Sequence, residues 1–145
     1  MKTQNGKLED FPMNTRVKLA GLWIVLMLLY IYCDIYSLHR PGYISEMIAG
    51  FIGPFEVSQM TLALFGILMA IPALMILVCL FIRRAAIAKW INVVAGVVYT
   101  IVNVGNLVGE SWAYYWLYGV IEIAVTVGAV VLAVKWPKEA IVNEQ

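Results

Sequence analysis

Four long apolar runs make up most of this chain, and they constrain its fold more than any motif does. The runs 60–82 and 91–109 contain no charged residue, the run 111–134 contains only Glu122, and the run 19–38 contains only Asp34. A helix needs about 20 mostly apolar residues to cross the hydrocarbon core of a bilayer. The sequence therefore predicts an all-α membrane protein with four transmembrane helices in an antiparallel bundle. The predicted spans are about 17–38, 59–82, 90–109 and 111–135.

The composition agrees with a membrane protein and limits its partners. Hydrophobic residues make up 63% of the 145 residues and charged residues 13%, whereas roughly a quarter of a soluble domain is charged. This length accommodates a single four-helix domain and leaves no room for a separate soluble one. The net charge of +1 gives no basis for binding nucleic acid. The lipid bilayer is the partner that the composition predicts.

The basic residues are distributed unevenly, and their distribution predicts the orientation. Of the 10 Lys and Arg residues, only Arg40 falls in the connection between the first two spans. The others precede the first span, lie at the connection between spans two and three, or follow the fourth span. Basic residues near the ends of spans stay on the cytoplasmic side. We therefore expect a multi-pass plasma-membrane protein with both termini in the cytoplasm.

The segment 39–58 is the one long connection, and we expect it on the extracytoplasmic side. Its apolar middle, 43–52, is too short to cross a bilayer, so it predicts a short interfacial or re-entrant segment, either a lid or a passive helix on the lipid head groups. Gly53, Pro54 and Glu56 resemble the start of a helix. Within the second span, Pro72 removes one backbone hydrogen bond and predicts a kink.

Polar residues within the spans recur at helical spacing. In the third span, alternating steps of four and three residues place one group on a single helix face: Asn92, Gly96, Tyr99, Asn103, Asn106 and Glu110. Similar spacing joins Tyr115, Tyr118, Glu122 and Thr126 in the fourth span, and Tyr30 and Asp34 in the first. Together they predict an outward-facing, acidic, tyrosine-lined pocket with Glu122 near the bilayer midplane. The predicted ligand-binding residues are Glu122, Asp34, Asn103, Asn106, Tyr99, Tyr30, Tyr115 and Tyr118.

Simpler explanations exist for most of these residues. Tyrosines at span ends form interfacial belts, and asparagines hydrogen-bond between membrane helices. Asp34 can pair with Arg40 or stay hydrated, and Glu110 is expected to cap a helix start. Glu122 is harder to explain, because a carboxylate at that depth needs a partner and the spans carry no basic residue there. It is expected either to be protonated and hydrogen-bonded, with Asn103 as a candidate partner, or to face water or a cation.

Other kinds of site have little support. The single histidine, His39, lies in a connection, so a haem held by two histidines is excluded, and no cofactor or metal is predicted. Cys33 and Cys79 are expected near opposite membrane faces, too far apart for a disulfide. Gly105 and Gly109 form a G-x-x-x-G motif, which permits close helix packing and leaves a homo-oligomer open.

Two segments, 30–42 (YIYCDIYSLHRPG) and 69–76 (MAIPALMI), resemble a family of small four-helix bacterial membrane proteins of unknown function. The similarity covers nearly the whole chain, from Leu8 to Pro137. It implies a four-helix fold and a location in the bacterial inner membrane, and it brings no activity. In layout alone, the chain is also similar to the sterol-isomerase and sigma-2-type receptor group, whose buried carboxylates face cationic amines or carbocation-like intermediates.

Three functions are consistent with the sequence. The first is binding or transport of a small cationic or lipid-like molecule, with Asp34 and Glu122 supplying charge and tyrosines supplying cation–π contacts. The second is a structural or accessory subunit without a ligand, in which the polar residues bond helices together. The third is an intramembrane enzyme that modifies a lipid or isoprenoid, with Glu122 or Asp34 as acid or base. Because no second catalytic group is evident, no catalytic residue is assigned.

Overall fold

Four long helices form the fold in the computed structural model, which describes residues 13–137. They are α1 (Thr15–Ser37), α3 (Gln59–Phe81), α4 (Ala85–Leu107) and α5 (Ala113–Val134). At about 1.5 Å per residue each is roughly 33–35 Å long, which matches a hydrocarbon core of about 30 Å. All four are long and apolar enough to cross a membrane, and they pack against one another. The prediction of an all-α bundle of four spans is confirmed, apart from one small hairpin between α1 and α3.

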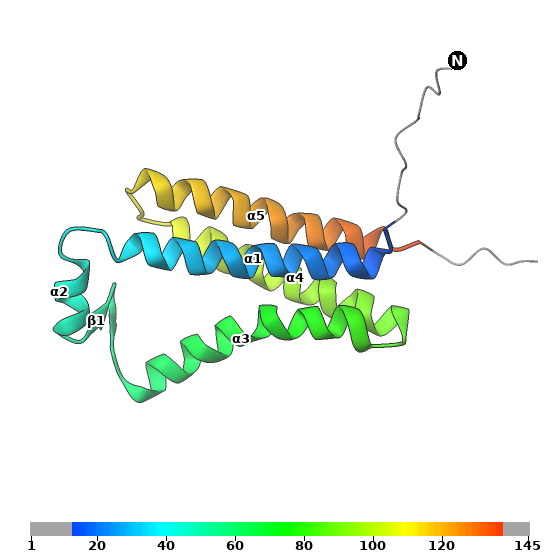
Figure 1. The fold of residues 1–145 in the computed structure, drawn as a ribbon, viewed down its shortest axis with the longest axis horizontal. Coiled ribbons are helices and arrows are strands. Elements are labelled where there is room, and N and C mark those ends of the chain that lie inside the picture. The colour runs from blue at the N-terminus through cyan, green and yellow to red at the C-terminus, as the bar shows by residue number, and fades with distance from the viewer. Residues whose placement is uncertain (1–12, 138–145) are drawn as a thin grey trace, which may run out of the picture.

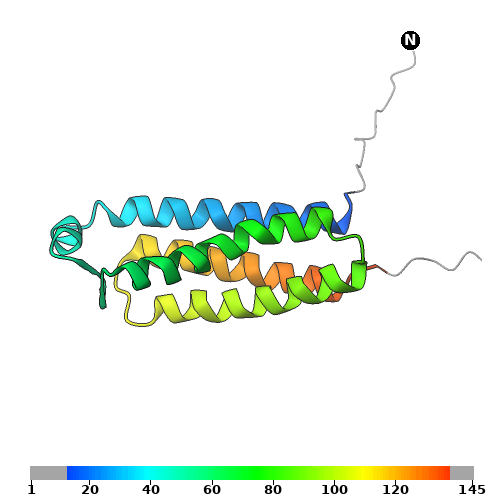
Figure 2. The ribbon, with the colours of Figure 1, turned by 90° about the horizontal axis from the view of Figure 1, so that it is seen from below.

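Consecutive long helices run in opposite directions (Figures 1 and 2). α1 packs against both α3 and α5, α5 packs along α4, and α3 meets α4 over a shorter stretch. The start of α1, the end of α5 and the α3–α4 connection lie together at what we call the terminal end (Figure 1). The long connection and the α4–α5 turn lie at the opposite end, which we call the loop end. The described Lys and Arg residues other than Arg40 come from segments near the terminal end.

Two basic side chains close helix ends at the terminal end. Arg16, in the first turn of α1, donates hydrogen bonds to three carbonyl oxygens at the end of α3. Lys89 donates to the carbonyl oxygen of Val134 at the end of α5, over 2.9 Å. The last carbonyls of a helix have no partner within it, and cations are favoured there. Lys89 itself belongs to α4, which begins at Ala85.

α3 bends near its middle, as Pro72 predicts, and the half before Pro72 diverges from the other helices (Figure 1). The buried residues of α3 are Pro72, Met75 and Cys79, none of which precedes the proline. Proline has no N–H, so the carbonyl oxygen four residues earlier, that of Leu68, loses its helical partner. The Tyr99 hydroxyl of α4 donates to this carbonyl oxygen. A side chain from a neighbouring helix thus replaces the missing bond.

The long connection contains a short helix, α2 (Tyr43–Ile48), and a two-stranded antiparallel hairpin, β1 (Phe51–Ile52) and β2 (Phe55–Glu56). The short helix lies within the predicted interfacial segment, and none of its residues is buried. The hairpin was not predicted. The connection adds little to the bundle core, which comes from the four long helices.

The predicted helix start at Gly53 and Pro54 is wrong. These two residues form the turn of the hairpin, where Gly53 has a φ of 55°, a left-handed conformation that glycine adopts without strain. α3 begins instead at Gln59, after Ser58, whose hydroxyl accepts a hydrogen bond from the Thr61 N–H at 3.1 Å. A Gly-Pro pair is compatible with both a tight turn and a helix start. The serine cap directly before Gln59 is the better indication of where α3 begins.

Close approach of α4 and α5 depends on glycines other than the predicted pair. A Cβ at Gly96 would come within 2.6 Å of a side chain of α5, and a Cβ at Gly119 within 2.5 Å of Leu107. Apart from its chain neighbours and the nearby backbone of its own helix, a Cβ built at Gly105 or Gly109 would meet no described atom within 4 Å. The G-x-x-x-G motif, which permits close packing or dimerisation, therefore does not bring two helices of the described chain together, and its role in a homo-oligomer stays a prediction. Gly109 instead turns the chain between α4 and α5, with a φ of 83°.

Candidate functional site

A small cavity lies among the four long helices, toward the loop end. Its volume is about 50 Å³. Each long helix contributes to its lining, which consists of Tyr30, Cys33, Asp34, Leu68, Met69, Tyr99, Val102, Asn106, Tyr115 and Glu122. Six of the eight predicted site residues are among them. The other two, Asn103 and Tyr118, do not line the cavity.

The helical spacing of α4 explains most of this placement. Asn92, Gly96, Tyr99 and Asn103 are all buried in the bundle, as their common face predicts. Asn106 is exposed, because the buried side of the helix continues through Leu107 instead. Steps of three and four residues from Asn103 are equally consistent with one face, so the spacing alone does not distinguish these two positions.

Glu122 is the deepest acidic group of the cavity. Its residue is 5% exposed, and it lies nine residues into α5, roughly 14 Å from the start of that helix at helical rise. The side-chain atom Oε1 is buried and has no hydrogen-bond partner among the described residues. Asn103, the candidate partner, does not hydrogen-bond to this oxygen in the described chain. Glu122 therefore presents an unpaired carboxyl oxygen inside the bundle.

Asn103 does not line the cavity, but it is hydrogen-bonded to a tyrosine that does. Its Oδ1 accepts a hydrogen bond of 2.7 Å from the Tyr30 hydroxyl, and Tyr30 lines the cavity. Its Nδ2 is buried without a partner among the described residues. Asn92, about three turns nearer the terminal end, contrasts with it: Oδ1 accepts from Trp23 Nε1 at 2.7 Å, and Nδ2 donates to the Ala88 carbonyl oxygen at 2.8 Å. Of these two buried asparagines, the one beside the cavity has the unpaired amide N–H group, and the one in the terminal half is fully bonded.

Asp34 and Asn106 form the accessible side of the cavity. Both side chains line it, yet both residues are exposed. The α3 contribution comes from Leu68 and Met69, which belong to the half of the helix that diverges before Pro72 (Figure 1). Asp34 does not pair with Arg40, since the Arg40 guanidinium bonds to Glu110 instead. The cavity therefore has polar groups at its exposed side as well as at its deepest point.

Arg40 lies at the loop end in a compact group of polar and aromatic side chains. Its Nη2 donates to Glu110 Oε2 at 2.7 Å, and its Nε donates to the Tyr114 hydroxyl. Glu110 Oε1 accepts from the backbone N–H groups of Ser111 and Trp112 at 2.7 and 3.0 Å. Both N–H groups precede Ala113, the first residue of α5, and no described side chain caps that helix, so Glu110 holds the turn before the last span and does not cap the helix as expected. The pairing with Arg40 was not predicted, because the two residues are far apart in the sequence.

The surroundings favour the charged forms of both partners. Partial burial opposes ionisation of Glu110, but hydrogen bonds from the Trp112 N–H, Arg40 and the Ser111 N–H outweigh it and lower the pKa of this carboxyl. Burial likewise lowers the pKa of Arg40, and its bonds to Glu110 and Tyr114 outweigh that effect and raise it. The ion pair is therefore maintained across the neutral pH range.

Tyr118 lies outside the cavity. It is half-buried, and its ring centre is 6.0 Å from that of Tyr36 on α1. Tyr36 in turn lies 6.1 Å from Tyr114. These rings form an aromatic group near one end of the bundle, which is the arrangement of an interfacial belt. The simpler explanation of Tyr118 fits its position.

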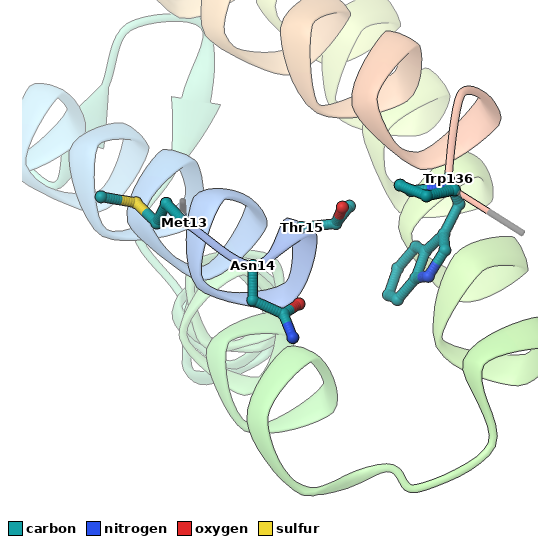
Figure 3. A pocket seen from close by; sticks show the side chains of 5 residues that line it. Met13, Asn14, Thr15 and Trp136 are labelled. Carbon is teal, nitrogen blue, oxygen red and sulfur yellow. The ribbon is translucent and has the colours of Figure 1, made fainter. Parts of the chain in front are cut away.

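A larger and more open hollow of about 440 Å³ lies at the terminal end, between the start of α1 and the segment after α5 (Figure 3). Met13, Asn14, Thr15, Trp136 and Pro137 line it. None of these side chains is charged, and Asn14 serves α1 as its cap, accepting from the Arg16 N–H at 2.9 Å. Helix capping accounts for the Asn14 amide, and no charged group lines this hollow, so the smaller cavity is the better candidate site.

Comparison with known proteins identifies the family of this chain. A search of curated proteins and a search of solved structures each found no match. The sequence pattern of DUF6326, a family of unknown function, matches residues 7–143. This range includes every helix described above, all residues of the cavity and the Arg40 group. The chain therefore belongs to DUF6326, a family of unknown function.

Proposed function

We propose that this protein binds the cationic head group of a small molecule in the cavity, close to Glu122 and Asp34. The observation that carries this proposal is the unpaired, buried Oε1 of Glu122 in a cavity whose lining residues include a second acid and no Lys or Arg. Arg40, the described basic residue at the loop end, is engaged by Glu110. A cation would supply the partner that the buried carboxyl lacks.

The size of the cavity limits what it accommodates. About 50 Å³ is far below the roughly 300–1,000 Å³ of a typical small-molecule site. This volume suits a small head group, such as a primary or methylated ammonium, with the rest of the ligand outside the bundle. A ligand with an apolar tail is therefore favoured, since the accessible side adjoins α3, whose first half exposes apolar side chains such as Leu64 and Ile67.

The cavity walls suit such a head group. Tyr30, Tyr99 and Tyr115 line the cavity, and aromatic rings attract cations through their electron-rich faces. Asn106, also in the lining, supplies an amide that can orient the ligand. These contacts support binding, and they support transport only if the site also opens toward the terminal end.

The orientation that we propose follows from charge. The basic residues near the terminal end favour the cytoplasm for that end, and the resemblance to bacterial proteins favours the inner membrane. The loop end, with the cavity beside it, would then face outward. A cation would reach the site from outside the cell or from the outer leaflet.

Native mass spectrometry of the protein released from mild detergent tests this function. Wild-type protein should carry a reproducible extra mass, and Glu122→Gln should lose it, because the neutral amide no longer balances a cation. Glu46→Gln is the matched control, since Glu46 lies on α2 away from the cavity and the change removes the same charge. An extra mass retained equally in Glu122→Gln would contradict the proposal.

A structural or accessory subunit is the second candidate. It is favoured by the interhelical bonds that Tyr30 and Tyr99 make to Asn103 and to the Leu68 carbonyl oxygen, since these use two of the predicted ligand contacts for packing. On this hypothesis, Glu122→Gln alters thermal stability or assembly, and the wild-type protein carries no bound mass.

A further inference from the structure

A second group of side chains suited to a cation lies at the loop end, and the cation that it surrounds is the protein's own Arg40. The guanidinium carbon of Arg40 is 5.3 Å from the ring centre of Trp112 and 5.1 Å from those of Tyr114 and Tyr115. Its Nη2 donates to Glu110 at 2.7 Å. We call Glu110, Trp112, Tyr114 and Tyr115 the cage. Several aromatic faces and a carboxylate around one positive charge are the groups with which proteins bind ammonium and guanidinium ligands.

We propose that the cage is a binding site for organic cations with an ammonium or guanidinium head group, and that Arg40 occupies it as a tethered competitor that closes the loop end of the cavity. This proposal rests on the proposed function in one respect, namely that the cavity ligand is a cation. The closure by Arg40 is independent of the proposed function, because we infer it from the position of the cage.

Tyr115 connects the cage to the cavity. Its ring lies against Arg40, and the same residue lines the cavity. Tyr114 is hydrogen-bonded to Ser37 at 2.9 Å, and Ser37 is the last residue of α1, the helix that contributes Cys33 and Asp34 to the lining. A cation that enters past Tyr115, and not through the accessible side at Asp34 and Asn106, therefore meets the cage first and has to take the place of Arg40.

The segment that carries Arg40 has few other attachments to the bundle. None of the residues of α2 is buried, and the hairpin makes one aromatic contact with α3, between Phe55 and Phe65 at 5.5 Å. The Arg40 side chain is 16% exposed and that of Glu110 13%, so water and small solutes reach the ion pair. Displacement of Arg40 from the cage would free the connection from the α4–α5 turn without disturbing the packing of the long helices.

Cys33 offers a reporter for this closure, because it lines the cavity and is 7% exposed. The second thiol, Cys79, is removed by Cys79→Ser, which keeps a donor for Asn92. The measurement is the rate at which two small methanethiosulfonates modify Cys33 in the full chain, one with a trimethylammonium group and one with a sulfonate. Arg40→Gln is compared with Arg84→Gln, which removes the same charge beside the start of α4.

Arg40→Gln should raise the rate for the trimethylammonium reagent at least about tenfold, which corresponds to about 1.4 kcal/mol lost from the closed state. Arg84→Gln should leave the rate unchanged. An unchanged rate in a folded Arg40→Gln protein would overturn the closure. A rise with both reagents equally would support closure by Arg40 and count against an acidic, cation-selective cavity, so the two proposals fail separately.

Competition in the protein with its own Arg40 tests the cage as a binding site and avoids any variant that fails to fold. Tetramethylammonium chloride should speed modification of Cys33 by the sulfonate reagent, because the free cation displaces Arg40 from the cage. Sodium chloride at the same ionic strength should not, since Na⁺ holds its water too firmly to replace a guanidinium among aromatic rings. Equal effects of the two salts would overturn the assignment of the cage as an organic-cation site.

Discussion

Glu122 and Asn103 stand out among the buried polar residues, because each leaves one side-chain atom without a hydrogen-bond partner in the described chain. A buried group in this state costs about 1–3 kcal/mol. Ser37 and Thr126, which are also buried, both donate their hydroxyls to backbone carbonyl oxygens of their own helices. The unpaired atoms are thus confined to the surroundings of the cavity, where a ligand could bond to them.

Replacement of Glu122 by an apolar residue should therefore not destabilise the protein. Glu122→Leu removes the unpaired carboxyl and keeps a side chain of similar length, so its free energy of unfolding should stay level or rise by about 1 kcal/mol. Unfolding in mixed detergent micelles measures this, with Thr126→Val as a comparison that removes a satisfied polar group. A clear loss of stability in Glu122→Leu would instead mean that the carboxyl bonds to the protein and has a structural role.

The ion pair between Arg40 and Glu110 should respond to acid in a defined direction. The lowered pKa of Glu110 means that its contribution to stability is complete above the ordinary value of 4.5 and is lost as the pH falls through the lower, folded-state value. Wild type should therefore melt at a higher temperature than Glu110→Gln at pH 7 and at pH 5, and the difference should disappear in stronger acid. A difference that vanishes already between pH 7 and pH 5 would contradict the lowered pKa.

Residue spacing predicted which polar side chains of the spans come together. It did not predict their hydrogen-bond partners. Tyr30, Tyr99, Tyr115 and Glu122 reach the cavity because helical periodicity sets their face. The partners of Arg40 and Tyr99 are a residue distant in sequence and a backbone carbonyl oxygen. Neither follows from a pattern within one helix, because both depend on how the helices pack.

At the scale of elements, the bend in α3 and the Tyr99 hydroxyl form one unit. Pro72 leaves the Leu68 carbonyl oxygen unpaired within the helix, and Tyr99 supplies its donor from α4. The kink was evident in the sequence, because a proline within a span has a known effect on the backbone. The donor was not, since tyrosines in this chain also serve in the interfacial belt and in the cavity wall.

A double-mutant cycle tests this unit. Tyr99→Phe alone should cost about 1–3 kcal/mol, because it leaves the partly buried Leu68 carbonyl oxygen without a donor. In a Pro72→Ala background the helix can supply its own N–H to that oxygen, so the same substitution should cost clearly less. The measurement is the free energy of unfolding of the four proteins, with Tyr32→Phe as a control at an exposed tyrosine. Equal costs in both backgrounds would show that Tyr99 acts independently of the proline.

For the whole molecule, the two ends of the bundle differ in charge and in contacts. Basic side chains gather near the terminal end, where Arg16 and Lys89 also cap α3 and α5. At the loop end, the ion pair of Arg40 is already formed within the protein. Among the described residues, the terminal end therefore offers several positive charges to anionic lipids and the loop end does not, which favours a cytoplasmic position for the terminal end.

Fusion reporters test this orientation. A green fluorescent protein fused after Gln145 should fluoresce, and an alkaline phosphatase fused at the same place should be inactive, because that enzyme needs an oxidising compartment. Phosphatase inserted in the hairpin turn after Gly53 should be active. The reverse pattern would place the loop end and the cavity in the cytoplasm.

We expect the bend in α3 to couple the protein to the thickness of the bilayer. A straight helix meets a thinner membrane by tilting as a whole, whereas a helix hinged at Pro72 can change its projected height by flexing one half. The flexing half contributes Leu68 and Met69 to the cavity. Short-chain lipids should therefore favour a more strongly bent α3 and a wider opening beside Asp34, and long-chain lipids a straighter helix and a narrower one.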